Sequence, residues 1–272
     1  MRFRDALEAR SARVPFKIKL AAVWLLIITV LSWTFLNYGF DIPFMRQWAP
    51  YISKGAPLTV FICVSAIILA CVLALVGALG RLSKNPIALG VSSFYVSFIR
   101  GTPLIVQIFF VYLGLPQFAR FAPPEMVSFF ILTSVQAGVI ALGVNYGAYM
   151  TEIFRAGIQS VGHGQVEAAQ ALAMSRGQTM RRIVLPQAIR MIIPPTGNEF
   201  IAMLKDSALV GLVGTQELFY RAQKVGQQNF RIMETLVVAA AFYWLLTSIF
   251  SYFQSKLERK MATGYVRQPH GH

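Results

Sequence analysis

Several polar side chains stand inside stretches of this 272-residue sequence that are otherwise apolar. A charge in the middle of a membrane helix costs about 2.5–3.5 kcal/mol on insertion scales, so such side chains are expected to face a protein interior or a cavity. Glu199 and Asp206 are seven residues apart and would share one helix face, as would Arg100 and Gln107. Carboxylate acceptors together with amide and hydroxyl donors suit a small solute that carries both signs of charge. The candidate residues are Gln107, Asn198, Glu199, Asp206 and Ser207.

A purely structural explanation exists for some of these residues. Arg100 can lie near the membrane surface and extend its guanidinium to water, and we favour this interpretation for Arg100. Lys205 and Asp206 can form an ion pair that holds a break in a helix. No nucleophile, base and orienting group cluster in the sequence, and its two cysteines lie in an apolar run. We therefore predict no catalytic site, no metal site and no cofactor.

A long polar segment runs from Glu152 to Met191, between two apolar runs. Its alanines and aliphatic residues recur at helical spacings among charged residues, which predicts short amphipathic helices. Gly177 and Pro186 mark breaks. The segment is too regular for a disordered loop, so we interpret it as a docking element for a soluble partner. A surface helix held in the lipid headgroups is the alternative.

Membrane helices are the elements that must position these residues. A spanning helix needs roughly 20 apolar residues, and we therefore predict an all-α integral membrane bundle of about six transmembrane helices. The six apolar runs cover about Leu20 to Phe40, Ala56 to Gly80, Ser92 to Pro116, Met126 to Met150, Ile189 to Val213 and Ile232 to Phe253. The first run is longer than the apolar core of a signal peptide and lacks an obvious cleavage site, so we expect it to be retained as an anchor.

The composition also indicates a membrane protein. Hydrophobic residues make up 56% and charged residues 13%, with a mean hydropathy of +0.57, whereas soluble domains carry about 25% charged residues. The net charge of +14 does not indicate nucleic-acid binding, because the basic residues lie between apolar runs. With a cytoplasmic amino terminus, 17 Lys and Arg residues fall in inside segments and 7 in outside segments. This asymmetry predicts that both termini are cytoplasmic.

The polar segment resembles a known family motif. Glu167-Ala168-Ala169 is followed by Ala173 and then by Ile183-Val184-Leu185-Pro186, a spacing similar to the EAA loop of ABC importer permeases, E-A-A-x3-G-x9-I-x-L-P. Ala173 stands where that family has glycine, and Gly177 is a nearby glycine that could assist the break. In that family the loop is a coupling helix that docks in a groove of the ATP-binding subunit. The resemblance thus assigns ATPase coupling to Glu167, Ala168, Ala169, Ala173, Gly177, Ile183, Leu185 and Pro186.

Further stretches resemble the branch of these permeases that serves polar amino acids such as histidine, lysine, arginine, glutamine, glutamate and cystine. They are Phe98 to Leu104 with Gln107, Tyr146 to Arg155 with Gly157 and Ile158, Pro194-Pro195, Asn198 to Phe200 and Lys205 to Leu209. Because the segment around Asp206 and Ser207 lines the cavity in related permeases, the resemblance favours a pathway role for both residues. An amino acid presents an ammonium and a carboxylate, and the candidate set offers acceptors and donors for them.

The resemblance implies a type I importer permease and its partners. The sequence has no G-x4-G-K-[ST] phosphate loop, so we expect a transport subunit that is not an enzyme, with ATP hydrolysis on a separate ATP-binding subunit. The family also implies a periplasmic or lipid-anchored substrate-binding protein, a second permease subunit, identical or homologous, and the bacterial inner membrane. We expect residues 1–54 to form a basic cytoplasmic tail, an extra membrane helix and an external loop. Residues 55–256 would form the permease core, and residues 257–272 a cytoplasmic tail.

Three other functions compete with this interpretation. An ABC permease for another small solute would differ only in its cargo. A secondary transporter driven by an ion gradient would need a coupling-ion site and often an internal repeat, and it would leave the EAA segment unexplained. A membrane-anchored scaffold would predict no polar face inside the spans, contrary to Asn198, Glu199 and Asp206.

Overall fold

The computed structural model describes residues 15–262, and this part of the chain is helical without any strand. The chain divides into two compact units, Met1–Gln47 and Trp48–His272. The first contains α2 (Phe16–Tyr38) and the start of α3 (Ile42–Ser53). The expectations for residues 1–14 and 263–272, which concern the two cytoplasmic tails, lie outside the described residues.

Helix α2 is a single apolar helix with exposed side chains along its length. Trp24 and Leu25 are 58% and 71% exposed, and apolar side chains that face outward along a long helix suit contact with lipid. Gly39 ends the helix in the left-handed conformation, with φ of 73°, which glycine adopts without the penalty of a side chain. The expected first span, Leu20 to Phe40, thus corresponds to α2.

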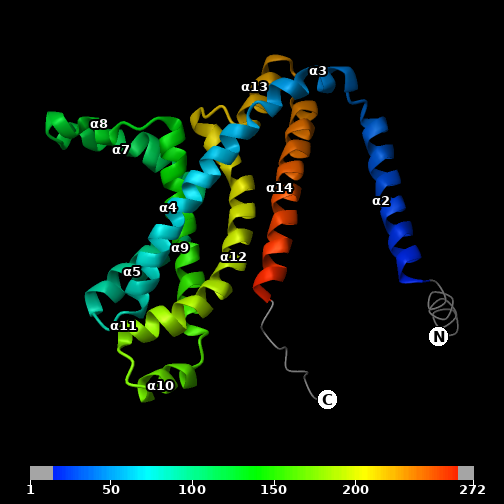
Figure 1. Ribbon diagram of the computed structural model, residues 1–272. Helices are drawn as coiled ribbons and strands as arrows, with labels where there is room; N and C mark the ends of the chain where they lie inside the picture. The colour runs from blue at the N-terminus through cyan, green and yellow to red at the C-terminus, as the bar shows by residue number, and fades with distance from the viewer. Residues whose placement is uncertain (1–14, 263–272) are drawn as a thin grey trace, which may run out of the picture. The chain divides into compact units, whose positions relative to one another are not determined.

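The second unit is a bundle in which α4 (Ala56–Leu82), α9 (Ser134–Gln159), α12 (Leu185–Asp206) and α14 (Ile232–Ala262) run lengthwise (Figure 1). Helices α5 (Pro86–Arg100) and α10 (His163–Ala171) lie at one end, and α13 (Leu218–Gln228) lies at the other. We refer to these as the α10 end and the α13 end. The shorter pieces are α6 (Leu104–Phe109), π-helical η1 (Phe110–Gly114), α7 (Leu115–Phe118), 3-10 turns η2 (Ala119–Phe121) and η3 (Pro124–Met126), α8 (Val127–Phe130), α11 (Arg176–Thr179), π-helical η4 (Met180–Val184) and 3-10 helical η5 (Ser207–Val213).

The core of this unit is the close packing of α4 against α9. On α4, four buried alanines recur every fourth residue: Ala66, Ala70, Ala74 and Ala78. On α9, a Cβ at Gly143 would lie 2.6 Å from the side chain of Leu69, so only glycine fits there. Small residues on facing helices let two backbones approach closely, which is how helices associate in a bilayer. These two helices form the frame on which the other helices pack.

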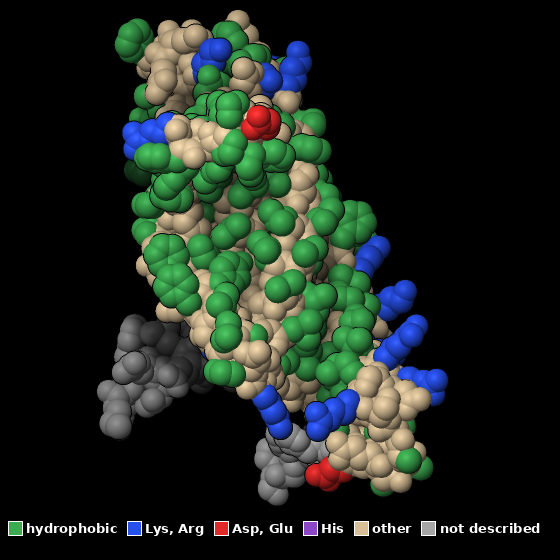
Figure 2. All heavy atoms as spheres, turned by 90° about the vertical axis from the view of Figure 1, so that its left-hand side faces the viewer, with side chains coloured by type: hydrophobic (Ala, Val, Ile, Leu, Met, Phe, Trp, Pro, Cys, Tyr) green, Lys and Arg blue, Asp and Glu red, His purple; other side chains and the backbone are tan. Residues whose placement is uncertain are grey.

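Fewer helices than the expected six can cross a membrane by length and composition. Among the described residues there are four: Phe16–Thr34, Ala56–Leu82, Leu104–Phe121 and Ile232–Met261. A fifth is counted if the bent pair Pro124–Phe130 and Ser134–Gln159 forms one span, with a bend of 71°. Hydrophobic side chains cover the middle of the face in Figure 2, and Lys and Arg gather toward its ends. The protein is therefore a multi-pass membrane bundle, but not every apolar run of the sequence forms one straight membrane-spanning helix.

Three of the predicted spans are interrupted in the structure. The run from Ser92 to Pro116 breaks at residues 101–103, between α5 and α6, and the run from Met126 to Met150 breaks at residues 131–133. The run from Ile189 to Val213 continues as α12 only to Asp206 and then becomes the 3-10 helix η5. Helix α12 is not among the apolar spans because it carries charged residues and three prolines, and it packs on α9 and α14.

The two π-helical segments have a common local cause. Each ends two residues before a proline, η1 before Pro116 and η4 before Pro186. A proline ring clashes with the carbonyl four residues earlier, and a widened turn relieves that clash. The backbone N–H of Leu185 accordingly donates to the carbonyl of Met180, five residues back. Pro186 therefore marks a bulge within a continuous helix from α11 to α12, rather than the helix break that the sequence predicts.

Candidate functional site

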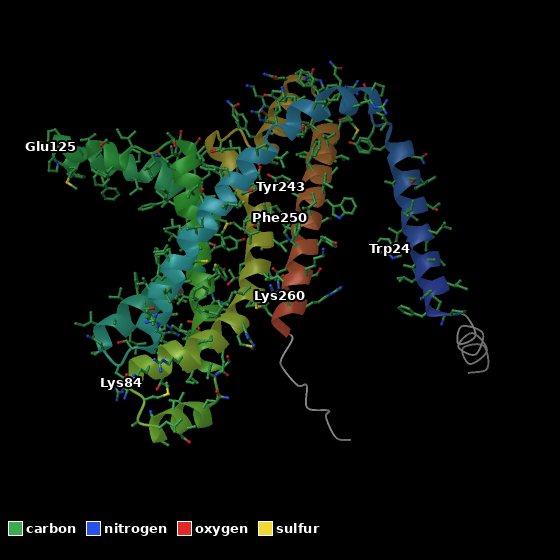
Figure 3. All side chains as sticks on the ribbon, in the orientation of Figure 1. Trp24, Lys84, Glu125, Tyr243, Phe250 and Lys260 are labelled. Carbon is green, nitrogen blue, oxygen red and sulfur yellow. The ribbon has the colours of Figure 1, made fainter. Side chains whose placement is uncertain are left out.

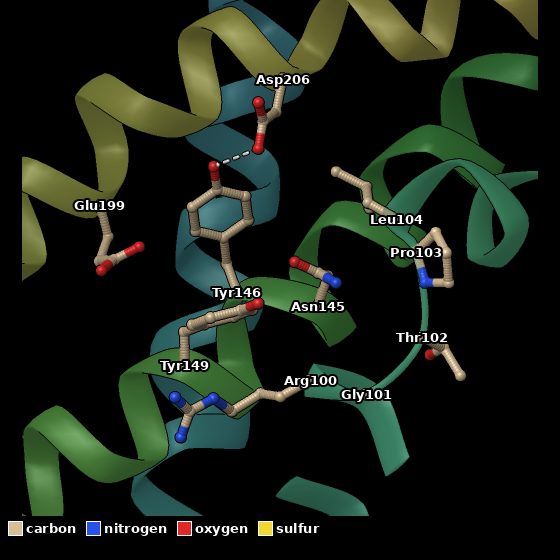
Figure 4. A pocket seen from close by; sticks show the side chains of 10 residues that line it. All are labelled: Arg100, Gly101, Thr102, Pro103, Leu104, Asn145, Tyr146, Tyr149, Glu199 and Asp206. Atoms are coloured by element: carbon tan, nitrogen blue, oxygen red, sulfur yellow. Dashed lines mark hydrogen bonds between the residues drawn. The ribbon is translucent and has the colours of Figure 1, made fainter. Parts of the chain in front are cut away.

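A polar cavity lies between α9, α12 and the turn that joins α5 to α6. Its volume is about 490 Å³, within the range of roughly 300–1,000 Å³ that is usual for ligand pockets. Figure 4 shows the residues that line it: Arg100, Gly101, Thr102, Pro103, Leu104, Asn145, Tyr146, Tyr149, Glu199 and Asp206. The cavity thus contains one cation, two carboxylates and several hydrogen-bonding groups.

The two signs of charge come from different elements of the cavity. Asp206 accepts a hydrogen bond of 2.8 Å from the hydroxyl of Tyr146, which orients this carboxylate. Arg100 lies with its guanidinium carbon 5.0 Å from the centre of the Tyr149 ring, a cation–π contact that holds the charge at the cavity wall. A solute between these groups would meet a cation and carboxylates together.

Helical spacing explains how α9 and α12 present these groups. Asn145 and Tyr149 are four residues apart on α9, and Glu199 and Asp206 are seven apart on α12, so each pair lies on one helix face. The predicted shared face of Glu199 and Asp206 is therefore present. The predicted shared face of Arg100 and Gln107 is absent, because Arg100 ends α5 and the turn at residues 101–103 separates it from α6.

Gln107 holds the turn between α5 and α6. Its Nε2 donates to the carbonyl of Ile99 and to the hydroxyl of Thr102, both at 2.8 Å. Its Oε1 accepts from Nδ2 of Asn145 at 3.0 Å. The amide is thus engaged on both sides and fixes the turn to α9. Gln107 supports a wall of the cavity rather than lining it.

The remaining two candidates lie elsewhere. Asn198 is exposed, and its Nδ2 lies 3.4 Å from Oε1 of Glu258 on α14. Ser207 is fully buried and donates to the carbonyl of Leu204 at 2.8 Å. Neither residue is among those that line the cavity. Of the five candidates, the structure brings together Glu199 and Asp206.

Sequence reasoning missed the aromatic and amide residues of α9. Tyr146 and Tyr149 lie in a stretch that carries the family resemblance, but aromatic residues in apolar runs usually pack or face lipid. Asn145 precedes that stretch. The four-residue spacing of Asn145 and Tyr149 was the signal for a polar face on α9.

The polar segment comprises the end of α9, the short helix α10, and then α11, η4 and the start of α12, which together form one continuous helix. Glu167 and Ala168 are exposed on α10, and Ala169 is buried. Helix α10 ends in a Schellman motif, in which Met174 N–H donates to the carbonyl of Ala169 at 3.1 Å and Ala173 N–H to that of Gln170 at 2.9 Å. The motif places a left-handed residue at Ala173, whose φ is 56°. The EAA motif has glycine at this position, and a left-handed backbone favours glycine because it has no Cβ.

Gly177 does not take over this role. It lies inside α11, between the capping-box residues Ser175 and Gln178, and its φ is not positive. The expectation that Gly177 assists the break is therefore wrong. Ile183 lies in η4, and Leu185 and Pro186 begin α12, so the second half of the motif forms the start of the helix that carries Glu199 and Asp206.

An ion-pair cluster lies on α9 where the polar segment begins. Glu152 pairs with Arg81 of α4 at 3.1 Å and with Arg155, one turn along α9, at 2.8 Å. Arg81 also donates to the hydroxyl of Ser93 on α5 at 2.6 Å. The cluster fixes α9 to α4 and α5 near the α10 end.

Comparison with known proteins assigns the family. Residues 66–263 match the model of the family described as "Binding-protein-dependent transport system inner membrane component". The chain belongs to this permease family. It is the transmembrane subunit of an ABC importer, a transport subunit rather than an enzyme, which confirms the expectation from the EAA motif.

The permease is similar to several known permeases and to a solved transporter structure. It is 40% identical to the probable amino-acid permease protein YxeN of Bacillus subtilis over 83% of this chain and 97% of that one. It is 37% identical to the arginine transport system permease protein ArgU of Corynebacterium glutamicum over 96% of this chain and 85% of that one. A crystal structure of an amino acid ABC transporter with histidines matches with a TM-score of 0.73 and 37% identity, covering 81% of this permease and 99% of that chain. These matches confirm the all-α permease fold, and the family implies an ATPase and a binding protein as partners.

Proposed function

We propose that this permease carries a polar amino acid, which it holds in the cavity between Arg100 and the carboxylates of Glu199 and Asp206. The presence of both signs of charge in one cavity is the observation that supports this assignment. The carboxylate of an amino acid pairs with a guanidinium, and its ammonium pairs with a carboxylate, through charge-assisted hydrogen bonds. Arg100 thus has a binding role, in place of the membrane-surface role that we favoured from the sequence.

The relatives support the same class of cargo. One is named as a probable amino-acid permease and another as an arginine transport permease. The preference for a particular amino acid depends on how the cavity contacts the side chain of the solute. The α9 wall of the cavity offers Asn145 and the two tyrosines to that end.

The chain connectivity supports coupling through α10. Helix α9 forms one wall of the cavity and ends at Gln159, four residues before α10 begins. Helix α12, which forms another wall, continues without a break from α11 and η4. The polar segment therefore joins two walls of the cavity. A separate ATPase that docks on Glu167, Ala168 and Ala169 would move the α12 wall by displacing α10.

We propose that the permease lies in the bacterial inner membrane. The α10 end and both termini lie in the cytoplasm, in agreement with the distribution of Lys and Arg. The binding protein delivers the amino acid at the α13 end, and a second permease, identical or homologous, completes the pathway. Residues 1–54 add an anchoring helix to the core of residues 55–256, and the cytoplasmic tail expected from residue 257 begins as the last turns of α14, which ends at Ala262.

Uptake by reconstituted proteoliposomes tests this proposal. The permease, its ATPase and its binding protein are assembled in vesicles, and uptake of radiolabelled histidine, lysine, arginine, glutamine, glutamate and cystine is measured with and without ATP. Glu167→Arg tests coupling, and Asp206→Asn tests the cavity. Glu234→Gln is the matched control, because Glu234, in the first turn of α14, pairs at 3.5 Å with Arg231, which precedes the helix, and lies outside both sites.

The proposal expects ATP-dependent uptake of one or a few of these amino acids, lost in Glu167→Arg, reduced about tenfold or more in Asp206→Asn, and unchanged in Glu234→Gln. Uptake that needs no ATP, or that Glu167→Arg leaves intact, would instead indicate an ion-coupled transporter. Uptake that Asp206→Asn leaves intact would remove the cavity from the pathway.

A further inference from the structure

Glu217 is a fully buried carboxylate that neither lines the cavity nor belongs to the polar segment. It stands at the N-cap of α13, between η5 and α13, outside the apolar spans. Burial raises the pKa of its carboxyl, and hydrogen bonds to the carboxylate oppose that shift. A buried carboxylate that keeps its charge needs several hydrogen-bond donors. The elements that supply these donors are the elements that Glu217 joins.

Donors from three helices converge on this carboxylate. The backbone N–H groups of Tyr220 and Phe219 in α13 donate to Oε1 and Oε2 at 2.7 and 2.9 Å. The hydroxyl of Tyr243, which Figure 3 labels on α14, donates to Oε2. The hydroxyl of Thr59 on α4 lies 3.5 Å from the same oxygen. Glu217 therefore joins α4, α13 and α14 at the α13 end.

Glu217 also packs against the segment that follows the cavity carboxylate. The 3-10 helix η5 begins at Ser207, the residue after Asp206, and contains Gly211. A Cβ at Gly211 would lie 2.6 Å from Oε1 of Glu217, so the backbone of η5 rests directly on the carboxylate. A short run of chain with helical hydrogen bonds thus links Glu217 to Asp206. A side chain that displaced Glu217 would displace η5.

We propose that Glu217 is a positioning residue for the cavity, which sets the place of Asp206 by anchoring η5 to the α13 ends of α4 and α14. Two contacts then define the position of the Asp206 carboxylate: the hydrogen bond from Tyr146 on the α9 side and the anchored η5 behind it. This inference rests on the proposed function, in which Asp206 binds the ammonium of the amino acid.

A double-mutant cycle tests whether Glu217 acts through Asp206. Glu217→Gln keeps the shape of the side chain but gives it an NH₂ group, which cannot accept from the N–H groups that both carboxylate oxygens now face. Binding of radiolabelled arginine, glutamine and cystine is measured on the permease–ATPase complex in lipid nanodiscs. The variants are Glu217→Gln, Asp206→Asn and the double variant, with Glu234→Gln as the control of the same residue type near the same end.

We expect Asp206→Asn to weaken amino-acid binding about tenfold and Glu217→Gln to weaken it about fivefold. The double variant should bind within about twofold of Asp206→Asn alone, because the effects of coupled residues are not additive. An equal fold-loss from Glu217→Gln in both backgrounds would show a general structural role and overturn this inference only. Unchanged binding in Glu217→Gln would overturn it as well. Unchanged binding in Asp206→Asn would instead overturn the proposed function of the cavity.

A milder variant keeps the test valid if Glu217→Gln fails to assemble. Tyr243→Phe removes one donor to Glu217 and leaves the ring and the N-cap of α13 in place. The same cycle with Asp206→Asn is expected to show a smaller loss, about threefold, that disappears in the Asp206→Asn background. A loss that persists in that background refutes the positioning role.

Discussion

The left-handed residue at Ala173 gives a prediction whose size follows from the backbone. An L-residue in this conformation costs roughly 1–2 kcal/mol, and glycine avoids that cost. Glycine also makes the unfolded chain more flexible, which costs about 0.4–1 kcal/mol. Ala173→Gly is therefore expected to stabilise the end of α10 by about 0.5–1 kcal/mol. Because 1.4 kcal/mol corresponds to a factor of ten, local opening becomes about two- to fivefold rarer.

Hydrogen exchange measures this change directly. The amide of Met174 is the reporter, because its hydrogen bond to the carbonyl of Ala169 forms only when Ala173 is left-handed. We expect its exchange in the permease, in nanodiscs, to slow by about two- to fivefold in Ala173→Gly. Gly177→Ala is the companion variant. A Cβ there meets nothing within 4 Å, so alanine should stabilise α11 by roughly 0.5–1 kcal/mol.

The two variants together distinguish the structure from the sequence hypothesis. If Gly177 supplied the flexibility that Ala173 lacks, Gly177→Ala would speed exchange around the turn and Ala173→Gly would have little effect. Faster exchange at Met174 in Ala173→Gly would refute the Schellman assignment. Slower exchange in both variants is the result that the observed backbone requires.

Three further substitutions follow from single contacts. Tyr146→Phe removes the donor to Asp206 and is expected to weaken amino-acid binding by about 3–10-fold, with the same yield of assembled permease. Glu152→Gln removes the charged partner of Arg81 and Arg155. Because these side chains are 23–30% exposed, solvent screens the ion pairs. We therefore expect the free energy of unfolding, measured by thermal unfolding, to fall by only about 1 kcal/mol. Gly143→Ala should cost about 1–3 kcal/mol in the same assay, because the new methyl group overlaps Leu69.

The sequence predicts the fold best where one apolar run forms one helix. The run from Ala56 to Gly80 corresponds to α4 (Ala56–Leu82), and the run from Ile232 lies within α14. It predicts the breaks poorly, although local signals exist. Pro103 disfavours the helical conformation for Thr102, and the turn at residues 101–103 follows. Hydropathy alone does not reveal such a helix break, because the segments around it are still mostly apolar.

The same cause explains which cavity residues sequence reasoning found. Glu199 and Asp206 lie on one uninterrupted stretch of α12, so their spacing gives their shared face. Arg100 and Gln107 have the same spacing, but the helix ends between them. Tyr146 and Tyr149 could not be separated from packing residues by type, because their role depends on contacts with Asp206 and Arg100. Spacing rules hold only within a continuous helix.

The linkage between the polar segment and the cavity is asymmetric. Helix α9 is fixed, because it packs closely on α4 and Glu152 pairs with Arg81. Helix α12 is continuous with α11 through η4, so a displacement of α10 that passes the turn at Ala173 reaches α12 directly. We therefore expect α12 to be the wall that moves during transport. Glu199, which is nearer the α10 end of α12, would then shift more than Asp206, which η5 and the hydrogen bond from Tyr146 hold in place.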